Sequence, residues 1–122
     1  MRVVHLPANK QRVEDAIHAV QTSGDVLLLP WGTFCQLGQE LGGGHSAALS
    51  WLRTLVSATG RPVAFSAPSC EMAGEAHILT PAAWSEERAL GWLGGLHEEV
   101  EAILGPTSLF HERSDGSRAR LD

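Results

Sequence analysis

The segments GDVLLLPWGTFCQLGQELGGGH (residues 24–45) and GRPVAFSAP (residues 60–68) decide the fold class of this chain. Residues 26–29 are an apolar run without alternation, which is typical of a strand covered on both faces. Pro30 ends that run, because proline has no N–H for a central ladder. Residues 61–65 suit a second strand, apolar after Arg61, and the sequence between the two strands includes a helical pattern. Strand, helix and strand in this order predict a crossover between parallel strands.

The sequence before this region predicts a strand and a helix. Residues 2–6 are an apolar run that Pro7 ends, and Asn9 is a residue type that caps helices. Four apolar residues then recur at helical spacing and mark a buried face: Val13, Ala16, Ile17 and Val20. Gly24 is expected to end this first helix.

The second half predicts more elements of the same kind. The helix of the crossover begins at His45 or Ser46, and Gly60 closes it. Residues 69–76 suit a short helix, residues 77–80 suit a short strand, and residues 80–104 suit one long helix with Pro81 in its first position. The sequence therefore predicts an α/β three-layer sandwich with a mostly parallel sheet of about four strands. Residues 1–108 form its single domain, and residues 109–122, with little apolar content, form a disordered tail.

Composition excludes several classes of protein. The formal net charge of −5 argues against a nucleic-acid binder, which carries a basic face. No apolar run approaches the roughly 18 residues that span a membrane, and residues 1–5 lead into no signal peptide. Two cysteines are too few for a disulfide framework, which favours a cytoplasmic protein with free thiols. A charged fraction of 19% is slightly low and is compatible with a homodimer.

The stretch 30–45 is expected to be a long loop that carries the binding site. Ligands of parallel sheets lie beyond the carboxyl ends of the strands, where this loop begins. Glycines before a helix allow backbone amides to approach an anion. No P-loop lysine follows them, and the dinucleotide fingerprint is absent. The candidate ligand-binding residues are Trp31, Gly32, Thr33, Gly43, Gly44, His45 and Ser66.

Two cysteines are candidate nucleophiles. Cys70 is expected in the first turn of a short helix and Cys35 in the loop, with His45 or His77 as a base. The alternative is that both thiols are buried as small apolar side chains. No Cys-x-x-Cys or His-x-x-x-His spacing is present, so no metal site and no cofactor are predicted.

The segment 25–79 resembles the core of the class I glutamine amidotransferase-like superfamily, which includes the PfpI-type proteases. The motifs that carry the resemblance are DVLLLPWG (25–32), WLR (51–53), GRPVA (60–64) and GEAHIL (74–79). The resemblance implies an α/β core with a nucleophile elbow after the third strand. Ala67 stands at the nucleophile position, and Cys70 lies three residues later. The resemblance therefore supports the fold and argues against the catalytic chemistry of that family.

Residues 30–44 are also similar to the N-terminal motif of creatininase-like amidohydrolases. That motif is Pro-x-Gly-Thr-x-x-Gln-x-Gly, and here it spans Pro30 to Gly38. Cys35 replaces a metal-binding Glu of that family and Leu37 replaces a His, so the family's metal site is not expected.

Three functions remain open from the sequence. The first is a non-catalytic domain that binds a small ligand, including an anionic one, or a partner chain through residues 30–45. The second is a cysteine-dependent hydrolase or a redox-responsive protein that uses Cys70 or Cys35. The third is an accessory subunit of a larger enzyme.

Overall fold

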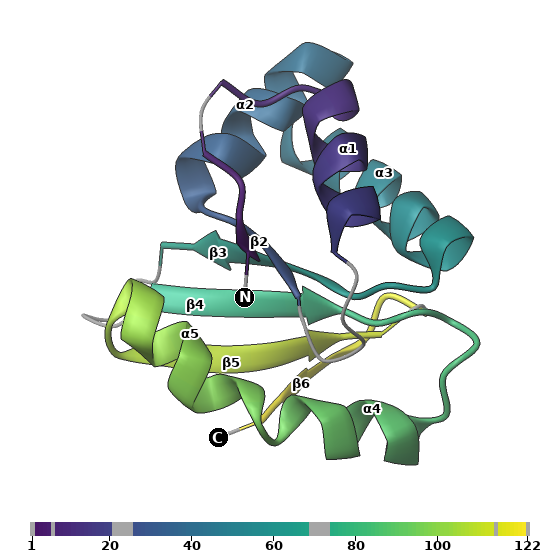
Figure 1. The fold of residues 1–122 in the computed structure, drawn as a ribbon, viewed down its shortest axis with the longest axis vertical. Helices are drawn as coiled ribbons and strands as arrows, with labels where there is room; N and C mark the ends of the chain where they lie inside the picture. Colours follow the sequence, from purple (N-terminus) through teal and green to yellow (C-terminus); the bar gives the residue numbers. More distant parts are fainter. Residues whose placement is uncertain (1, 6, 21–25, 69–73, 114, 122) are drawn as a thin grey trace.

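The protein folds around one six-stranded mixed sheet whose strands follow chain order, β1 to β6 (Figure 1). The computed structural model describes residues 2–5, 7–20, 26–68, 74–113 and 115–121. Helices α1, α2 and α3 cover one face of the sheet, and α4 and α5 cover the other (Figure 1). The predicted α/β class is confirmed, but the expected four-stranded, mostly parallel sheet is wrong.

The first half is a parallel unit of three strands. Strand β1 (Arg2–Val3) pairs with β2 (Leu27–Leu29), and β2 pairs with β3 (Val63–Ala67). Helix α1 (Lys10–Ala19) joins the first two strands, and the Asn9 side chain accepts from the N–H of Arg12, which confirms the predicted cap. Gly24, the expected end of that helix, lies outside the described residues.

The crossover from β2 to β3 contains two helices, and the prediction of a long loop is wrong. Helix α2 (Trp31–Leu41) begins directly after Pro30, and α3 (Gly44–Thr59) follows it. Gly42 ends α2 in the left-handed conformation with φ of 80°. A Cβ on Gly38 would lie 2.5 Å from the Gly44 carbonyl oxygen, so the glycines permit a tight helical hairpin. The predicted end of α3 at Gly60 is confirmed.

The second half runs in the opposite direction. Strand β4 (Gly74–Leu79) is antiparallel to β3, and β5 (Thr107–Glu112) is parallel to β4. Between them lie α4 (Glu86–Leu93), which Ser85 caps, and α5 (Leu96–Leu104), so the expectation of one helix from residue 80 to 104 is wrong. Ala76 lies in β4 and not in a short helix, while residues 69–73 lie outside the described residues.

The C-terminal segment also differs from its expected disorder. Strand β5 crosses the expected boundary at residue 108, and β6 (Arg118–Arg120) pairs with it antiparallel. Leu109, His111 and Glu112 are buried. The strand reads Thr-Ser-Leu-Phe-His-Glu, and the polar side chains of His111 and Glu112 are buried beside Thr80 and His77. The low apolar content of this segment therefore does not predict its structure, because part of it forms paired strands.

Candidate functional site

The carboxyl ends of β2 and β3 meet the start of β4 around a hollow of about 420 Å³, which we call the Trp31 hollow. Trp31 enters it from the first turn of α2, and its backbone N–H donates to Ser66 Oγ at 2.9 Å. This hydrogen bond joins the end of β3 to the start of α2. Residues that line the hollow include Trp31, Phe34, His45, Phe65, His77 and Arg118.

A row of near-parallel rings forms one wall of the hollow and continues across the sheet. Phe34 stacks on Phe65 with centroids 4.3 Å apart, and Phe65 stacks on His77 at 5.1 Å. Phe110 continues the row at 5.1 Å from His77. Because Phe65, His77 and Phe110 are register partners on adjacent strands, their spacing follows from the separation of strands in a sheet. The hollow therefore has a rigid aromatic surface.

His77 lies between two carboxylates at the inner end of the hollow. Its Nδ1 lies 2.8 Å from Glu112 Oε1, and its Nε2 lies 3.1 Å from Glu75 Oε2. Arg118 Nε donates to Glu112 at 2.6 Å, and Arg53 lies 3.6 Å from the other carboxylate oxygen. Burial is the largest influence on the pKa of Glu112 and acts to raise it, but the hydrogen bond with His77 and the charge of Arg118 hold that pKa below its ordinary value.

The N-terminus of α3 forms the outer rim. Gly43 occupies the N-cap position and provides no side-chain cap, and the next residues that line the hollow are His45 and Ser46. The first backbone N–H groups of a helix have no intrahelical acceptors, and they carry partial positive charge. This end of a 16-residue helix is therefore a favourable place for an anionic group.

Cys35 and His45 also meet at this rim. Cys35 Sγ lies 3.3 Å from His45 Nε2, within the reach of a hydrogen bond that involves sulfur. The His45 ring lies 4.5 Å from the Trp31 ring and 5.7 Å from the Phe34 ring. Cys35 is half-buried on α2, whereas Cys70 lies outside the described residues. Of the two predicted nucleophiles, Cys35 is thus the one with a described basic neighbour.

The predicted ligand-binding residues divide into two groups. Trp31 and His45 line the Trp31 hollow, and Ser66 lines an adjoining pocket of about 220 Å³ that also contacts Trp31. Thr33 is buried, and its hydroxyl donates to the Val4 carbonyl at 2.8 Å, which gives it a structural contact. Gly32, Gly43 and Gly44 are exposed in the helical hairpin and do not line the hollow.

Sequence reasoning names His77 as a candidate base but misses Glu75, Phe110 and Glu112 around it. Glu75 and His77 lie two residues apart on β4, and Phe110 and Glu112 lie two residues apart on β5, so each pair points to one face of the sheet. That spacing was a usable signal on both strands. The predictions of a helix over residues 69–76 and of a tail over residues 109–122 conceal this spacing.

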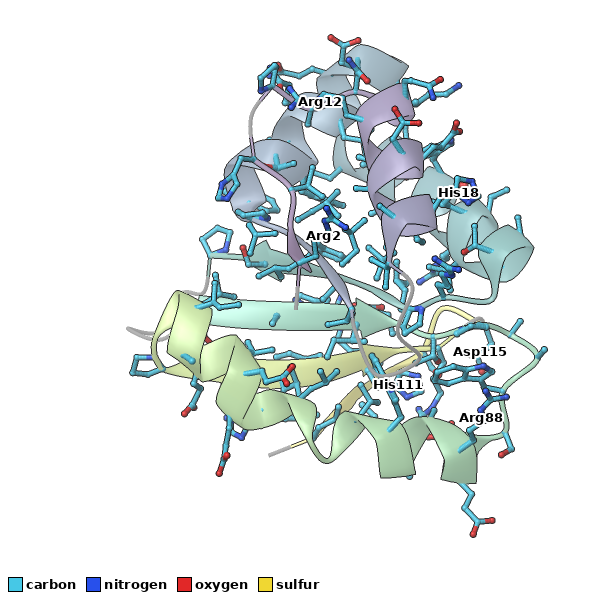
Figure 2. The ribbon with its side chains drawn as sticks, in the orientation of Figure 1. Arg2, Arg12, His18, Arg88, His111 and Asp115 are labelled. Atoms are coloured by element: carbon cyan, nitrogen blue, oxygen red, sulfur yellow. The ribbon has the colours of Figure 1, made fainter. Side chains whose placement is uncertain are left out.

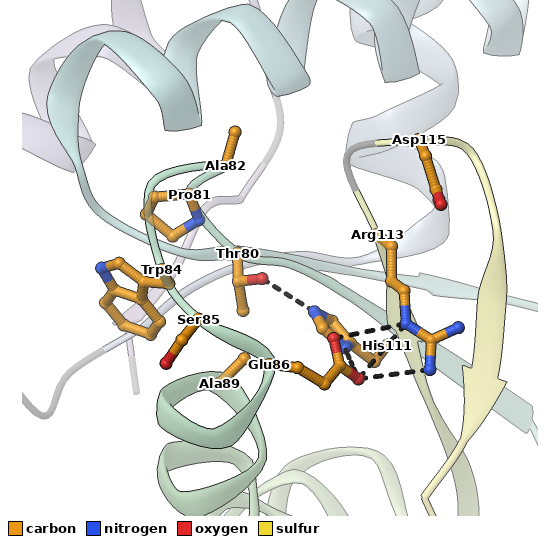
Figure 3. Close-up of a pocket in the computed structure, with 10 residues that line it drawn as sticks. All are labelled: Thr80, Pro81, Ala82, Trp84, Ser85, Glu86, Ala89, His111, Arg113 and Asp115. Atoms are coloured by element: carbon orange, nitrogen blue, oxygen red, sulfur yellow. Dashed lines mark hydrogen bonds and ion pairs between the residues drawn. The ribbon is translucent and has the colours of Figure 1, made fainter.

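A second edge site lies at the opposite end of the sheet. Since β4 is antiparallel to β3, the carboxyl ends of β4 and β5 point away from the Trp31 hollow. Figure 2 places His111 and Asp115 on this side of the molecule, far from Arg12 at the start of α1. His111 is buried in a pocket of about 140 Å³ there, and Figure 3 shows its lining.

Three further observations concern metal sites, membrane spans and similarity to known proteins. Within the described ranges, no group of three or more His, Cys, Asp or Glu side chains is arranged to hold a metal ion. In the same ranges, no helix combines the length and the apolar content needed to cross a membrane. No protein-family profile, curated protein or solved structure matches the chain.

Proposed function

We propose that this protein binds a small planar ligand that carries an anionic group, such as an aromatic carboxylate, in the Trp31 hollow. The observation that carries the proposal is the set of rings from Trp31, Phe34 and Phe65 beside the uncapped N-terminus of α3 in one hollow. A volume of about 420 Å³ falls within the range of small-molecule sites.

The two parts of the ligand have separate places. The planar part stacks against Trp31, which is half-buried and so keeps a free portion of its ring surface. The anionic part lies at the rim, where the N–H groups of His45 and Ser46 and the dipole of α3 stabilise it. At the inner end Arg118 is paired with Glu112 and Glu75 also lines the hollow, so the charges there leave the rim as the place for the anionic group.

Calorimetric titration with 2-naphthoate tests this proposal. A ligand of this size is expected to bind with a dissociation constant in the millimolar range or below. Its saturated analogue decalin-2-carboxylate and its neutral analogue 2-naphthamide should bind more weakly, because each lacks one of the two features. Equal binding of all three compounds, or no binding of 2-naphthoate, would contradict the proposal.

A pair of serine variants on α3 locates the anionic group. Ser46→Asp places a carboxylate at the rim and should weaken 2-naphthoate by about tenfold, while it leaves the helix intact, because acidic residues are favourable in the first turn. Ser50→Asp introduces the same charge one turn later on an exposed position and should have little effect. Equal effects of the two variants would place the anion elsewhere.

Cysteine chemistry is a second candidate function, and the Cys35–His45 contact of 3.3 Å favours it. An imidazole at this distance can accept the thiol proton and so generate the nucleophilic thiolate. The test is the rate of alkylation by iodoacetamide at pH 7 in a Cys70→Ser background. His45→Ala should slow the reaction of Cys35 by about tenfold or more. An unchanged rate would remove this candidate.

A partner chain at the same hollow, a homodimer and an accessory role in a larger enzyme remain predictions. The resemblance to the glutamine amidotransferase-like superfamily remains one as well.

A further inference from the structure

The pocket around His111 lies where the parallel strands β4 and β5 end. Ligand sites of open α/β sheets form at such carboxyl ends, and this crossover contains α4 and α5. The residues that line the pocket and matter here are Thr80, Trp84, Glu86, His111, Arg113 and Asp115 (Figure 3). They come from the end of β4, the start of α4 and the end of β5. The pocket is therefore built by one half of the fold alone.

His111 presents an unsatisfied nitrogen to this pocket. Its side chain is 2% exposed, and its Nε2 lies 2.7 Å from Thr80 Oγ1. Its Nδ1 is buried, and within the part of the chain that the structure describes it has no hydrogen-bond partner. The carboxylate oxygen Glu86 Oε1 lies 3.9 Å from Nδ1, which is too long for a hydrogen bond. A buried nitrogen without a partner is unfavourable, which indicates a missing group.

The distance of 3.9 Å leaves room for one bridging atom. A single ligand nitrogen can lie about 2.9 Å from both His111 Nδ1 and Glu86 Oε1 and donate a hydrogen bond to each. Burial lowers the pKa of His111 below its ordinary value, so the neutral ring prevails at pH 7. The Thr80 hydroxyl can donate to Nε2 or accept from it, so a ligand N–H at Nδ1 selects the tautomer in which Nε2–H donates to Thr80 and Nδ1 accepts.

The charges around the pocket select a cation. Among the residues that line the pocket, Glu86 and Asp115 supply two carboxylates and Arg113 supplies one guanidinium, which already donates to Glu86 Oε1 at 3.2 Å. The N-terminus of α4 does not favour an anion, because Ser85 caps it and Glu86 and Glu87 fill its first turn. Trp84 also lines the pocket, and the Arg88 guanidinium lies over its ring at 4.3 Å from the centre, so the cation contact of that face is made within the chain.

We propose that this pocket binds a small primary ammonium compound, whose N–H groups donate to His111 Nδ1 and to the carboxylate of Glu86. The volume of about 140 Å³ limits the ligand to about the size of benzene. This site is separate from the Trp31 hollow, so the two proposals stand or fall independently.

Titration with methylammonium chloride, followed by the long-range ¹H–¹⁵N spectrum of the imidazoles, tests the site. We expect a saturable shift of the His111 Nδ1 signal, with a dissociation constant in the millimolar range for so small a ligand. The exposed His45 should not shift. Sodium acetate should leave His111 unmoved. An unmoved His111 signal, or an equal response to acetate, would overturn the proposal.

A matched pair of variants tests the role of the carboxylate. Glu86→Gln removes the charge that faces Nδ1 and should weaken methylammonium by about tenfold or more. Glu87→Gln removes the adjacent charge of the same helical turn, which does not line the pocket, and should leave the affinity nearly unchanged. Equal losses in the two variants would show a general electrostatic effect and would contradict the proposed contact. A saturable shift with zinc chloride alone and none with methylammonium would contradict it as well.

Discussion

Glu112 Oε1 lies 2.8 Å from His77 Nδ1, and both side chains are almost fully buried, at 2% and 3% exposure. This pair joins β5 to β4 and fixes the ring that forms the inner end of the Trp31 hollow. The C-terminal segment, for which the sequence predicts disorder, therefore supports the candidate site.

Removing the charge of Glu112 should strongly destabilise the fold. Glu112→Gln removes the buried carboxylate that His77, Arg53 and Arg118 share, and leaving buried hydrogen-bonding groups unsatisfied costs about 1–3 kcal/mol. Urea denaturation measures this loss. Glu101→Gln, which breaks an exposed pair with His97, should change the free energy of unfolding by less than about 1 kcal/mol. Similar losses in both variants would contradict the importance of the buried pair.

Acidification should destabilise the protein in two steps. The pKa of His111 in the folded state is below its ordinary 6.5, so on acidification the unfolded chain takes up a proton first. The free energy of unfolding therefore falls as the pH drops from about 6.5 through the pKa of His111 in the folded state. The pKa of Glu112 in the folded state is below its ordinary 4.5. This carboxylate therefore adds stability that is present above pH 4.5 and is lost as the pH falls through the pKa of Glu112 in the folded state.

Urea denaturation across a pH series checks both signs. His111→Gln should flatten the upper step and keep the lower one. A free energy of unfolding that rises between pH 7 and pH 5 in the wild type, and not in His111→Gln, would refute the assignment of the upper step.

Gly38 should be required for the helical hairpin of α2 and α3. Gly38→Ala places a Cβ 2.5 Å from the Gly44 carbonyl oxygen, and the backbone shift needed to relieve this clash should cost about 1–3 kcal/mol. Gly91→Ala in α4 meets no atom within 4 Å and should instead stabilise by about 0.5–1 kcal/mol. Thermal unfolding of both variants measures the contrast, and a neutral Gly38→Ala would show that the hairpin can separate without cost.

Truncation after Pro106 should abolish cooperative unfolding. It removes β5, which contributes buried Leu109, His111 and Glu112 and pairs along its whole length with β4. Truncation after Ser117 keeps β5 and removes β6, so it should leave a cooperative but weaker fold. Circular dichroism during heating distinguishes the two. A cooperative transition in the shorter chain would support the disordered tail that composition suggests.

The sequence predicts the elements whose signals are local. Strand β2 is an uninterrupted apolar run, α1 has its Asn9 cap, and α3 ends at Gly60 with φ of 69°. Each of these depends on a few consecutive residues. They are sufficient for the α/β class and for the parallel pairing of β2 with β3.

The missed elements depend on contacts between distant residues. Helix α2 carries buried Phe34 and Leu37 at helical spacing. The many glycines around them suggest a loop, because the close approach of Gly38 to Gly44 that requires glycine is visible only in the structure. Strand β5 buries His111 and Glu112, whose polarity suggests solvent exposure until Thr80 and His77 are seen beside them. The same pairings bring Glu75, His77 and Arg118 to the site.

The indole N–H signals in a ¹H–¹⁵N spectrum test the central proposal most directly. The chain has four tryptophans, and the Trp31→Phe variant assigns the signal of Trp31 by its loss. Titration with 2-naphthoate should shift the Trp31 signal in a saturable manner and leave that of Trp84, which lines the opposite pocket, unmoved. A Trp31 signal that does not move at saturating 2-naphthoate, or equal shifts of Trp31 and Trp84, would contradict binding in the Trp31 hollow.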